Sequence, residues 1–203
     1  LTALPNVIDY TSGREIKEQQ RMISVLATEC RRRDDLFAAA QTDNYTAYNR
    51  DQKQRGGEKL PALVVMVDRL SQWYELLSDA EQDRLTGIIK GAAGRGIYFV
   101  CTAMARNEIA TGLRESFTCM PMGLDAVSDY ADALNCRIPT DVALPRITPG
   151  RGLMKTEVGV REFQIALAFG EAGDSLRSQR IAAYGEGLDR SVQPVINIVH
   201  VPE

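Results

Sequence analysis

The chain has 203 residues, of which 44% are hydrophobic and 25% are charged, and its formal net charge is −3 with a pI of about 5.4. This composition is that of a globular protein with enough residues for one large domain and its core. The acidic balance argues against a domain that holds nucleic acid by itself, and no apolar run approaches the roughly 18 residues of a membrane-spanning helix.

The chain begins "LTALPNVIDY", with no initiator Met and no charged stretch ahead of an apolar run. We therefore expect a fragment of a longer protein and not a secretory precursor. The cysteines form no CxxC pair, and the only histidine is His200. This argues against a zinc site and favours buried, reduced thiols in a cytosolic protein. The four cysteines are Cys30, Cys101, Cys119 and Cys136.

The first third of the chain predicts one long helix between two irregular segments. Residues 6–10 predict a short strand or an extended entry, and the capping-box pair Ser12 and Glu15 predicts a helix that runs to about residue 40. The arginines at 31–33 lie in its second half, where they form either a solvated face that suits the helix dipole or a phosphate-binding patch. Residues 41–59 are polar and end in two glycines, which predicts a loop.

Two apolar segments predict the strands of a parallel sheet. The first is "LPALVVMVD", which ends at Asp68, and the second is "IYFVCTA" at 97–103. Between them, a second capping box at Ser78 and Glu81 begins a helix that ends at the glycines of "GAAGRG". Strands that are apolar throughout are typical of parallel sheets covered on both faces.

The last third adds a different pattern. Residues 117–122 predict a third strand and 126–134 a short helix, and two antiparallel strands follow around a turn near Gly159. A helix is expected around Ser175–Ala183, and the tail, "VQPVINIVHVPE", predicts a strand or an extended arm. We therefore expect an α/β fold: a mostly parallel sheet flanked by helices, with a small antiparallel extension near the C-terminus.

The first strand carries the strongest chemical signal. Its apolar residues run directly into Asp68, as in nucleotide hydrolases whose strand-end carboxylate holds magnesium. A phosphate loop of the form GxxxxGK[ST] is absent from the sequence. The glycine-rich residues 91–96 follow a helix and precede a strand, the reverse of the order that a phosphate cradle needs, so they predict a helix stop.

The order of several motifs is more specific than any one of them. A helix with "ECRRRDD" precedes "YTAYN", "LPALVVMVDRL", "GIIKGAAGRGIYFVCTA", "EIATGL", "SDYADAL" and "PGRGLMKTEVGVREFQIAL". Over about residues 1–190 this run resembles the motor domain of the FtsK/SpoIIIE family, most of all the C-terminal module of type VII secretion ATPases of the EssC/EccC kind. The resemblance implies a RecA-like P-loop NTPase core, a single ATPase domain over residues 1–203, and a multidomain parent whose phosphate loop lies upstream of residue 1.

The resemblance also assigns roles at the strand ends. Asp68 matches the family's magnesium-facing Asp, and Thr102 its sensor Thr, so both are candidate nucleotide- and Mg²⁺-binding residues with ATP and Mg²⁺ as the implied cofactors. Arg69 replaces the Glu that polarises the attacking water, and Ala103 replaces a Gln or Asn. Because a guanidinium cannot accept a proton, we assign no catalytic residue and predict weak or absent ATP hydrolysis.

Several other residues allow two interpretations. Met104, Ile109 and Leu113 are candidates for a partner groove, with core filling as the alternative. The pair Trp73 and Tyr74 either packs on the next helix or holds a partner. Four arginines at turns or strand ends are either solvated or include a finger for a neighbour's nucleotide. These four are Arg95, Arg106, Arg114 and Arg151.

The resemblance implies a cytoplasmic module of a complex anchored in the inner membrane. Its implied partners are small secreted helical proteins and other ATPase modules of the same chain or ring. The alternative is an active DNA translocase of cell division, sporulation or conjugation, but the acidic pI, Arg69 and Ala103 count against it. A third interpretation is an interaction domain that has kept only the fold.

Overall fold

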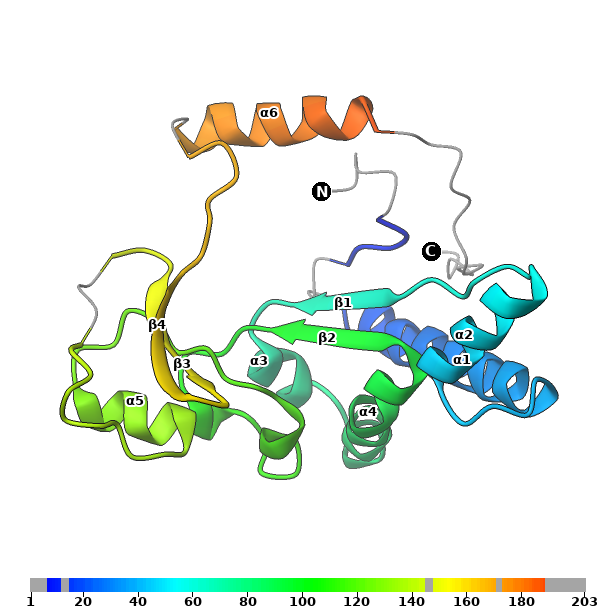
Figure 1. Cartoon of the computed structure of the whole chain (residues 1–203), viewed down its shortest axis with the longest axis horizontal. Coiled ribbons are helices and arrows are strands. Elements are labelled where there is room, and N and C mark those ends of the chain that lie inside the picture. Colours follow the sequence, from blue (N-terminus) through cyan, green and yellow to red (C-terminus); the bar gives the residue numbers. More distant parts are fainter. Residues whose placement is uncertain (1–6, 12–14, 145–147, 171–172, 189–203) are drawn as a thin grey trace. The chain divides into compact units, whose positions relative to one another are not determined.

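The computed structural model describes residues 7–11, 15–144, 148–170 and 173–188, which form two compact units that divide after Ser116 (Figure 1). The helices and strands of the first unit are α1 (Ile16–Ala39), α2 (Tyr45–Arg55), β1 (Leu63–Val67), α3 (Leu70–Glu75), α4 (Asp79–Ala92) and β2 (Ile97–Cys101). Three short 3₁₀ turns complete it: η1 (Ala93–Arg95), η2 (Arg106–Glu108) and η3 (Arg114–Ser116). Residues 7–10, expected as a short strand or an extended entry, have no regular secondary structure.

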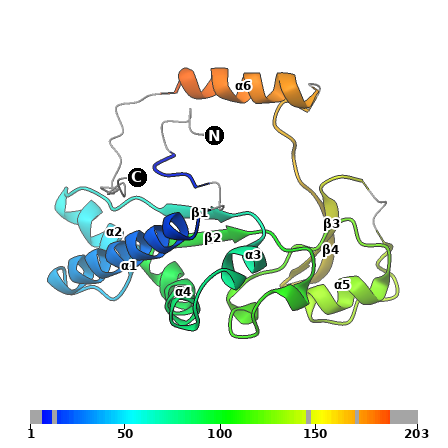
Figure 2. The same ribbon diagram turned by 180° about the vertical axis from the view of Figure 1, so that it is seen from behind.

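The strands β1 and β2 form the predicted parallel pair, with a register that runs from Leu63 opposite Ile97 to Val67 opposite Cys101. Helices α1 and α4 lie along one face of this pair (Figure 2). The other face does not follow the expectation of a sheet covered on both sides, because its apolar side chains are exposed. These side chains are Val64, Met66, Tyr98 and Val100.

The core of the first unit lies where α1 contacts α4 and α4 contacts β2. Complete burial of one Leu or Ile side chain contributes about 1.5–3 kcal/mol, so this layer supplies much of the unit's stability. The capping box predicted at the start of α4 is present, and the predicted helix stop is confirmed because Gly96 follows η1 with a φ of 72°. The buried side chains include Ile23, Leu26, Leu85, Ile88, Ile89 and Ile97.

The arginine run of α1 is not simply a solvated face or a phosphate patch, because Arg33 is 1% exposed. Its guanidinium donates hydrogen bonds to the carbonyl oxygens of Arg95 at 2.8 Å and Pro61 at 3.0 Å, and to Glu29 Oε1 at 2.6 Å. Pro61 precedes β1 and Arg95 precedes β2, so one buried side chain ties α1 to the amino ends of both strands. Periodicity alone does not reveal this contact.

The polar segment 41–59 was predicted to be a loop, and this prediction was wrong, because it contains α2. The Asn44 side chain caps this helix by accepting a hydrogen bond from the Ala47 N–H at 3.0 Å. The Asn49 side chain donates to the Leu60 carbonyl and accepts from the Leu60 N–H, both at 2.8 Å, and the ring of Tyr48 lies 5.5 Å from that of Phe37. These tertiary contacts hold a helix that has no buried face of its own.

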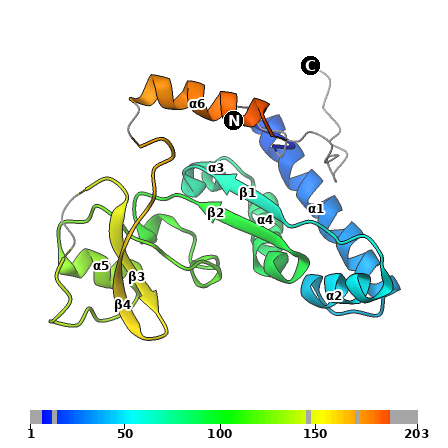
Figure 3. The same ribbon diagram turned by 45° about the horizontal axis from the view of Figure 1, so that its top comes forward.

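The second unit contains α5 (Val127–Leu134), the hairpin strands β3 (Arg151–Thr156) and β4 (Gly159–Gln164), and α6 (Asp174–Glu186) (Figure 3). The hairpin confirms the antiparallel extension, with Arg151 opposite Gln164 and Thr156 opposite Gly159. The core of the second unit lies between α5 and the hairpin and consists of buried side chains. These are Tyr130, Leu134, Ile138, Leu153 and Val160.

The expected strand at 117–122 is reduced to a single antiparallel bridge between Met122 and Gly152. A Cβ added at Gly152 would overlap the carbonyl of Pro121, so this close backbone approach requires glycine. The tail at 192–203 and Ser12 lie outside the described residues. Among the helices of the described ranges, none has the length and hydropathy to cross a membrane.

Candidate functional site

The carboxyl ends of β1 and β2 bring Asp68 and Thr102 together. Each follows its strand directly, so the parallel register places the two residues side by side. The Thr102 hydroxyl donates a hydrogen bond to Asp68 Oδ1 at 2.6 Å and accepts one from the Arg69 N–H at 2.8 Å. The N–H of Leu70, the first residue of α3, donates a hydrogen bond to the Thr102 carbonyl at 3.0 Å and so links the start of α3 to the end of β2. The two predicted nucleotide-site residues therefore form one exposed polar cluster.

Arg69 occupies the turn between β1 and α3 in the left-handed backbone region, with a φ of 54° and a ψ of 69°. This conformation is uncommon for a residue with a side chain and is held here by the hydrogen bond of its N–H to Thr102. A guanidinium is a hydrogen-bond donor with no lone pair that can accept a proton. Arg69, the residue next to Asp68, therefore carries a positive charge and cannot act as a general base.

Glu108, in η2, is a second acid at this edge, and the sequence interpretation did not include it. Its Oε2 accepts hydrogen bonds from the Met104 N–H at 3.1 Å and from the Ser71 hydroxyl at 3.4 Å. Ser71 belongs to α3 and Met104 follows β2, so Glu108 joins the two segments that leave the strands. In the sequence it is one exposed acid among many, and only the fold of the 102–108 segment identifies it.

The donor set at the edge suits a partial magnesium site. Mg²⁺ prefers oxygen ligands and is commonly held by one or two carboxylates together with phosphate oxygens and water. Asp68 and Thr102 offer one carboxylate and one hydroxyl, whereas no group of three or more His, Cys, Asp or Glu side chains with metal-binding geometry occurs among the described residues. These residues fit a magnesium ion that arrives with a nucleotide, not one caged by protein alone.

Cys101, at the end of β2, does not add a nucleophile to the cluster. Burial raises the pKa of its thiol to about 11. The thiol therefore stays protonated and neutral at pH 7, and the reactive thiolate is rare.

The three candidate groove residues do not share one surface. Met104 is 72% exposed, Ile109 is half-buried, and Leu113 is fully buried. Leu113 therefore lies in the core of the first unit, and of these three residues only Met104 presents a largely exposed apolar side chain. Ala103, next to Thr102, is exposed and offers no polar group.

Among the four candidate finger arginines, three are engaged within the chain. Arg95 pairs with Asp34 at 2.7 Å, Arg151 with Glu162 at 3.2 Å, and Arg114 donates to the Ile109 carbonyl at 2.8 Å. Tyr74 packs against α4, with its hydroxyl 3.0 Å from Thr86 Oγ1, as its packing interpretation expects.

No family model matches the chain. Curated relatives are two DNA translocases FtsK of Campylobacter jejuni, 34% and 33% identical over 98 residues, or 48% of this chain. The chain spans only 10% of the length of each of these relatives.

Solved structures match nearly the whole chain. EssC (ATPases 2 and 3) from Geobacillus thermodenitrificans has a TM-score of 0.76 at 22% identity, over 92% of this chain and 34% of that one. The cytoplasmic domain of EssC has a TM-score of 0.70 at 22% identity, over 99% and 38%. Thermomonospora curvata EccC (ATPases 2 and 3), in complex with a signal sequence peptide, has a TM-score of 0.72 at 17% identity, over 98% and 36%.

At these identities the structural matches establish the fold, and the FtsK relatives add similarity of sequence across slightly less than half of the chain. The helices, the parallel pair β1–β2 and the separate β3–β4 hairpin correspond to the predicted core and its antiparallel extension. The chain therefore has the α/β fold of the ATPase domains of EssC and EccC, and about half of it is similar in sequence to FtsK.

Proposed function

We propose that the chain is a degenerate FtsK/SpoIIIE-like module of a type VII secretion ATPase that helps to recognise or export small helical proteins and hydrolyses ATP weakly or not at all. The observation that carries the proposal is Arg69, which follows Asp68 at the end of β1 and presents a guanidinium beside the candidate magnesium carboxylate. Loss of a group that positions or activates water typically costs several kcal/mol of transition-state stabilisation. Ala103 adds to this loss by removing a polar group beside Thr102.

Nucleotide binding is a separate part of the proposal. It is supported by Asp68 and Thr102, which offer two adjacent oxygen ligands joined by a hydrogen bond of 2.6 Å. The 203 residues contain no phosphate loop of their own, and they span about a third of the EssC and EccC chains they match. We propose that they form one ATPase domain of a longer protein, in which another segment supplies the phosphate contacts for ATP.

The proposed partners follow from the fold and from one neighbour. The similar EccC structure holds a signal sequence peptide, which supports a peptide-recognition role for a module of this fold. Other ATPase modules of the same chain or ring are the second proposed partner. The proposed location is the cytoplasmic side of a complex anchored in the inner membrane, consistent with a neighbour that is the cytoplasmic domain of EssC.

The test of the hydrolysis proposal is Arg69→Glu in the full-length protein. This change restores an acid beside Asp68, and we expect steady-state ATP turnover to rise at least about tenfold from a low starting rate. Arg50→Gln, at an exposed position on α2, is the matched control and leaves turnover unchanged. High turnover of the unchanged protein would overturn the proposal of an eroded site.

The test of recognition uses labelled peptides from the C-termini of small secreted helical-hairpin proteins. We expect Met104→Glu, which places charge on an exposed apolar position, to weaken peptide binding about fivefold or more in a fluorescence anisotropy titration. Val158→Glu is a matched control, because Val158 is 77% exposed on the hairpin of the second unit. Equal binding by both variants would remove Met104 from the interface, and no binding by the assembled full-length protein would reject the recognition role.

The second candidate function is an active DNA translocase. The sequence similarity to the FtsK relatives favours it, whereas the net charge of −3 and Arg69 oppose it. The two functions differ in one measurement, the effect of double-stranded DNA on ATP turnover by the full-length protein. Strong stimulation by DNA would replace the secretion proposal with the translocase, and no stimulation is expected here.

A further inference from the structure

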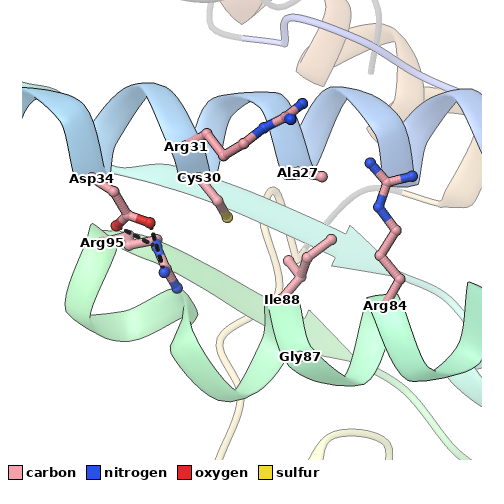
Figure 4. A pocket seen from close by; sticks show the side chains of 8 residues that line it. All are labelled: Ala27, Cys30, Arg31, Asp34, Arg84, Gly87, Ile88 and Arg95. Atoms are coloured by element: carbon pink, nitrogen blue, oxygen red, sulfur yellow. Dashed lines mark hydrogen bonds and ion pairs between the residues drawn. The ribbon is translucent and has the colours of Figure 1, made fainter.

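A groove of about 360 Å³ runs between α1 and α4 in the first unit (Figure 4). Its lining includes none of the residues of the strand-end cluster, which are Asp68, Arg69 and Thr102. The floor is small or apolar, and the rim carries three arginines with a single acid. The lining residues are Ala27, Cys30, Arg31, Asp34, Arg84, Gly87, Ile88 and Arg95.

The charges of the groove are not balanced. Asp34 is fully engaged by Arg95, with Oδ1 at 2.7 Å from Nε and Oδ2 at 2.8 Å from Nη2. Arg31 is exposed and donates to the Thr28 hydroxyl at 3.4 Å, and Arg84 is exposed as well. Across the described ranges, neither Arg31 nor Arg84 has an acidic partner. Two guanidiniums thus remain without a counter-charge in a chain whose net charge is −3.

The floor of the groove is open to a visiting chain. A Cβ added at Gly87 would meet no atom within 4 Å, so nothing fills the space above α4 at this point. Ile88 and Ala27 offer apolar contact from the two helices, and Arg84 extends from α4 toward α1 (Figure 4). Burial raises the pKa of the Cys30 thiol, which is therefore neutral and contributes no negative charge.

Two features favour a protein segment over a nucleotide as the occupant. Most lining residues lie within α1 and α4, where backbone N–H groups are already used in the helices, so the amide cradle of a phosphate site is missing. None of the lining residues is aromatic, so a base has no ring on which to stack. A carboxylate side chain needs only the guanidinium forks that Arg31 and Arg84 present.

We propose that the groove between α1 and α4 docks an acidic segment of a partner protein, whose carboxylates pair with Arg31 and Arg84 while an apolar side chain rests on Ile88. The docking is independent of nucleotide and of the strand-end cluster. A test of this docking proposal is therefore independent of the proposed secretion role. Charge complementarity of this kind sets specificity and association rate and makes binding sensitive to salt.

The probe is a labelled amphipathic peptide with two Glu residues one helical turn apart next to a Leu, and its analogue with Gln in place of Glu. With the 203-residue chain, we expect the Glu peptide to bind in a fluorescence anisotropy titration, and its affinity should fall as NaCl is added. The Gln peptide should bind at least about tenfold more weakly than the Glu peptide. The double variant Arg31→Gln with Arg84→Gln should lose about tenfold in affinity. Arg50→Gln is the control, because Arg50 is also exposed and has no acidic partner among the residues that the structure describes.

Gly87→Leu separates docking from folding. The added side chain fills the open floor and should abolish peptide binding, yet the replacement of a mid-helix glycine favours the helix and should raise the Tm. Equal binding of the Glu and Gln peptides, or full binding by the double arginine variant, would overturn the proposal. Tighter binding of inorganic triphosphate than of the Glu peptide would also overturn it, in favour of a phosphate site.

Discussion

The two ends of the β1–β2 pair use polar contacts in opposite ways. At the amino ends, Arg33 is 1% exposed and its hydrogen bonds to Pro61 and Gly96 hold both strands against α1. At the carboxyl ends, Asp68 and Thr102 form a hydrogen bond that is open to solvent. A buried polar group has no water to replace a lost partner, whereas an exposed one does. The amino ends are therefore built for stability, and the carboxyl ends leave polar groups available to a ligand.

The largest expected effect is at the buried end, in Arg33→Met. This change leaves the Glu29 carboxylate without one of its partners and the carbonyls that Arg33 served without a donor, and we expect a loss of about 3–5 kcal/mol in the free energy of unfolding. Urea denaturation followed by circular dichroism measures it. Arg31→Met, two residues away on the exposed side of α1, is the control and should change stability by less than about 0.5 kcal/mol. Equal stability of the two variants would remove Arg33 from its proposed role.

Gly96→Ala tests the backbone at the amino ends of β1 and β2. Gly96 has a φ of 72°, and an added Cβ would overlap the ring of Tyr45. Left-handed strain and overpacking together should cost about 2–3 kcal/mol. Thermal unfolding detects this as a lower Tm. Gly94→Ala, where an added Cβ meets nothing within 4 Å, should leave the Tm nearly unchanged, and a similar loss in both would contradict the steric argument.

The pH dependence of the buried end provides the next test, through Glu29. Burial acts to raise the pKa of this carboxyl, but the hydrogen bonds from Arg32 and Arg33 outweigh burial, and the pKa falls below its usual 4.5. Because the pKa is lower in the folded state, the stabilisation is complete above pH 4.5 and is lost as the pH falls through the folded pKa. Glu29→Gln should cost about 2 kcal/mol at pH 7, and the difference from the unchanged protein should shrink below pH 4.5. A constant difference from pH 7 to pH 3 would exclude this contribution.

The contrast between the two ends also explains what sequence could predict. Strands β1 and β2, α4 with its capping box and the β3–β4 hairpin follow from apolar periodicity and turn residues, which are local signals. The helix α2 depends on contacts from Asn49 to Leu60 and from Tyr48 to Phe37, and no local pattern contains them.

In the candidate site, too, some features follow from local sequence signals and others only from tertiary contacts. Asp68 and Thr102 were predicted from the family resemblance, and the parallel register of β1 and β2 brings them together because it aligns the carboxyl ends of the strands. Glu108 reaches that edge only through the fold of the segment after β2, and Arg33 reaches the opposite edge from a helix about 60 residues away in sequence. The interpretation of the arginine run therefore failed at Arg33, where burial decides the role and sequence shows only charge.

The smallest expected effect is at the open end, in Thr102→Val. Valine keeps the shape of threonine but removes the hydroxyl that donates to Asp68 and accepts from the Arg69 N–H. Because Thr102, Asp68 and Arg69 are all exposed, water replaces both contacts, and the free energy of unfolding should fall by less than about 1 kcal/mol in urea denaturation. Thr118→Val, at an exposed position in the second unit, controls for the general effect of the substitution. A loss as large as that of Arg33→Met would mean that the strand-end cluster holds the turn after β1 in place, and its residues would then be explained by folding without any ligand.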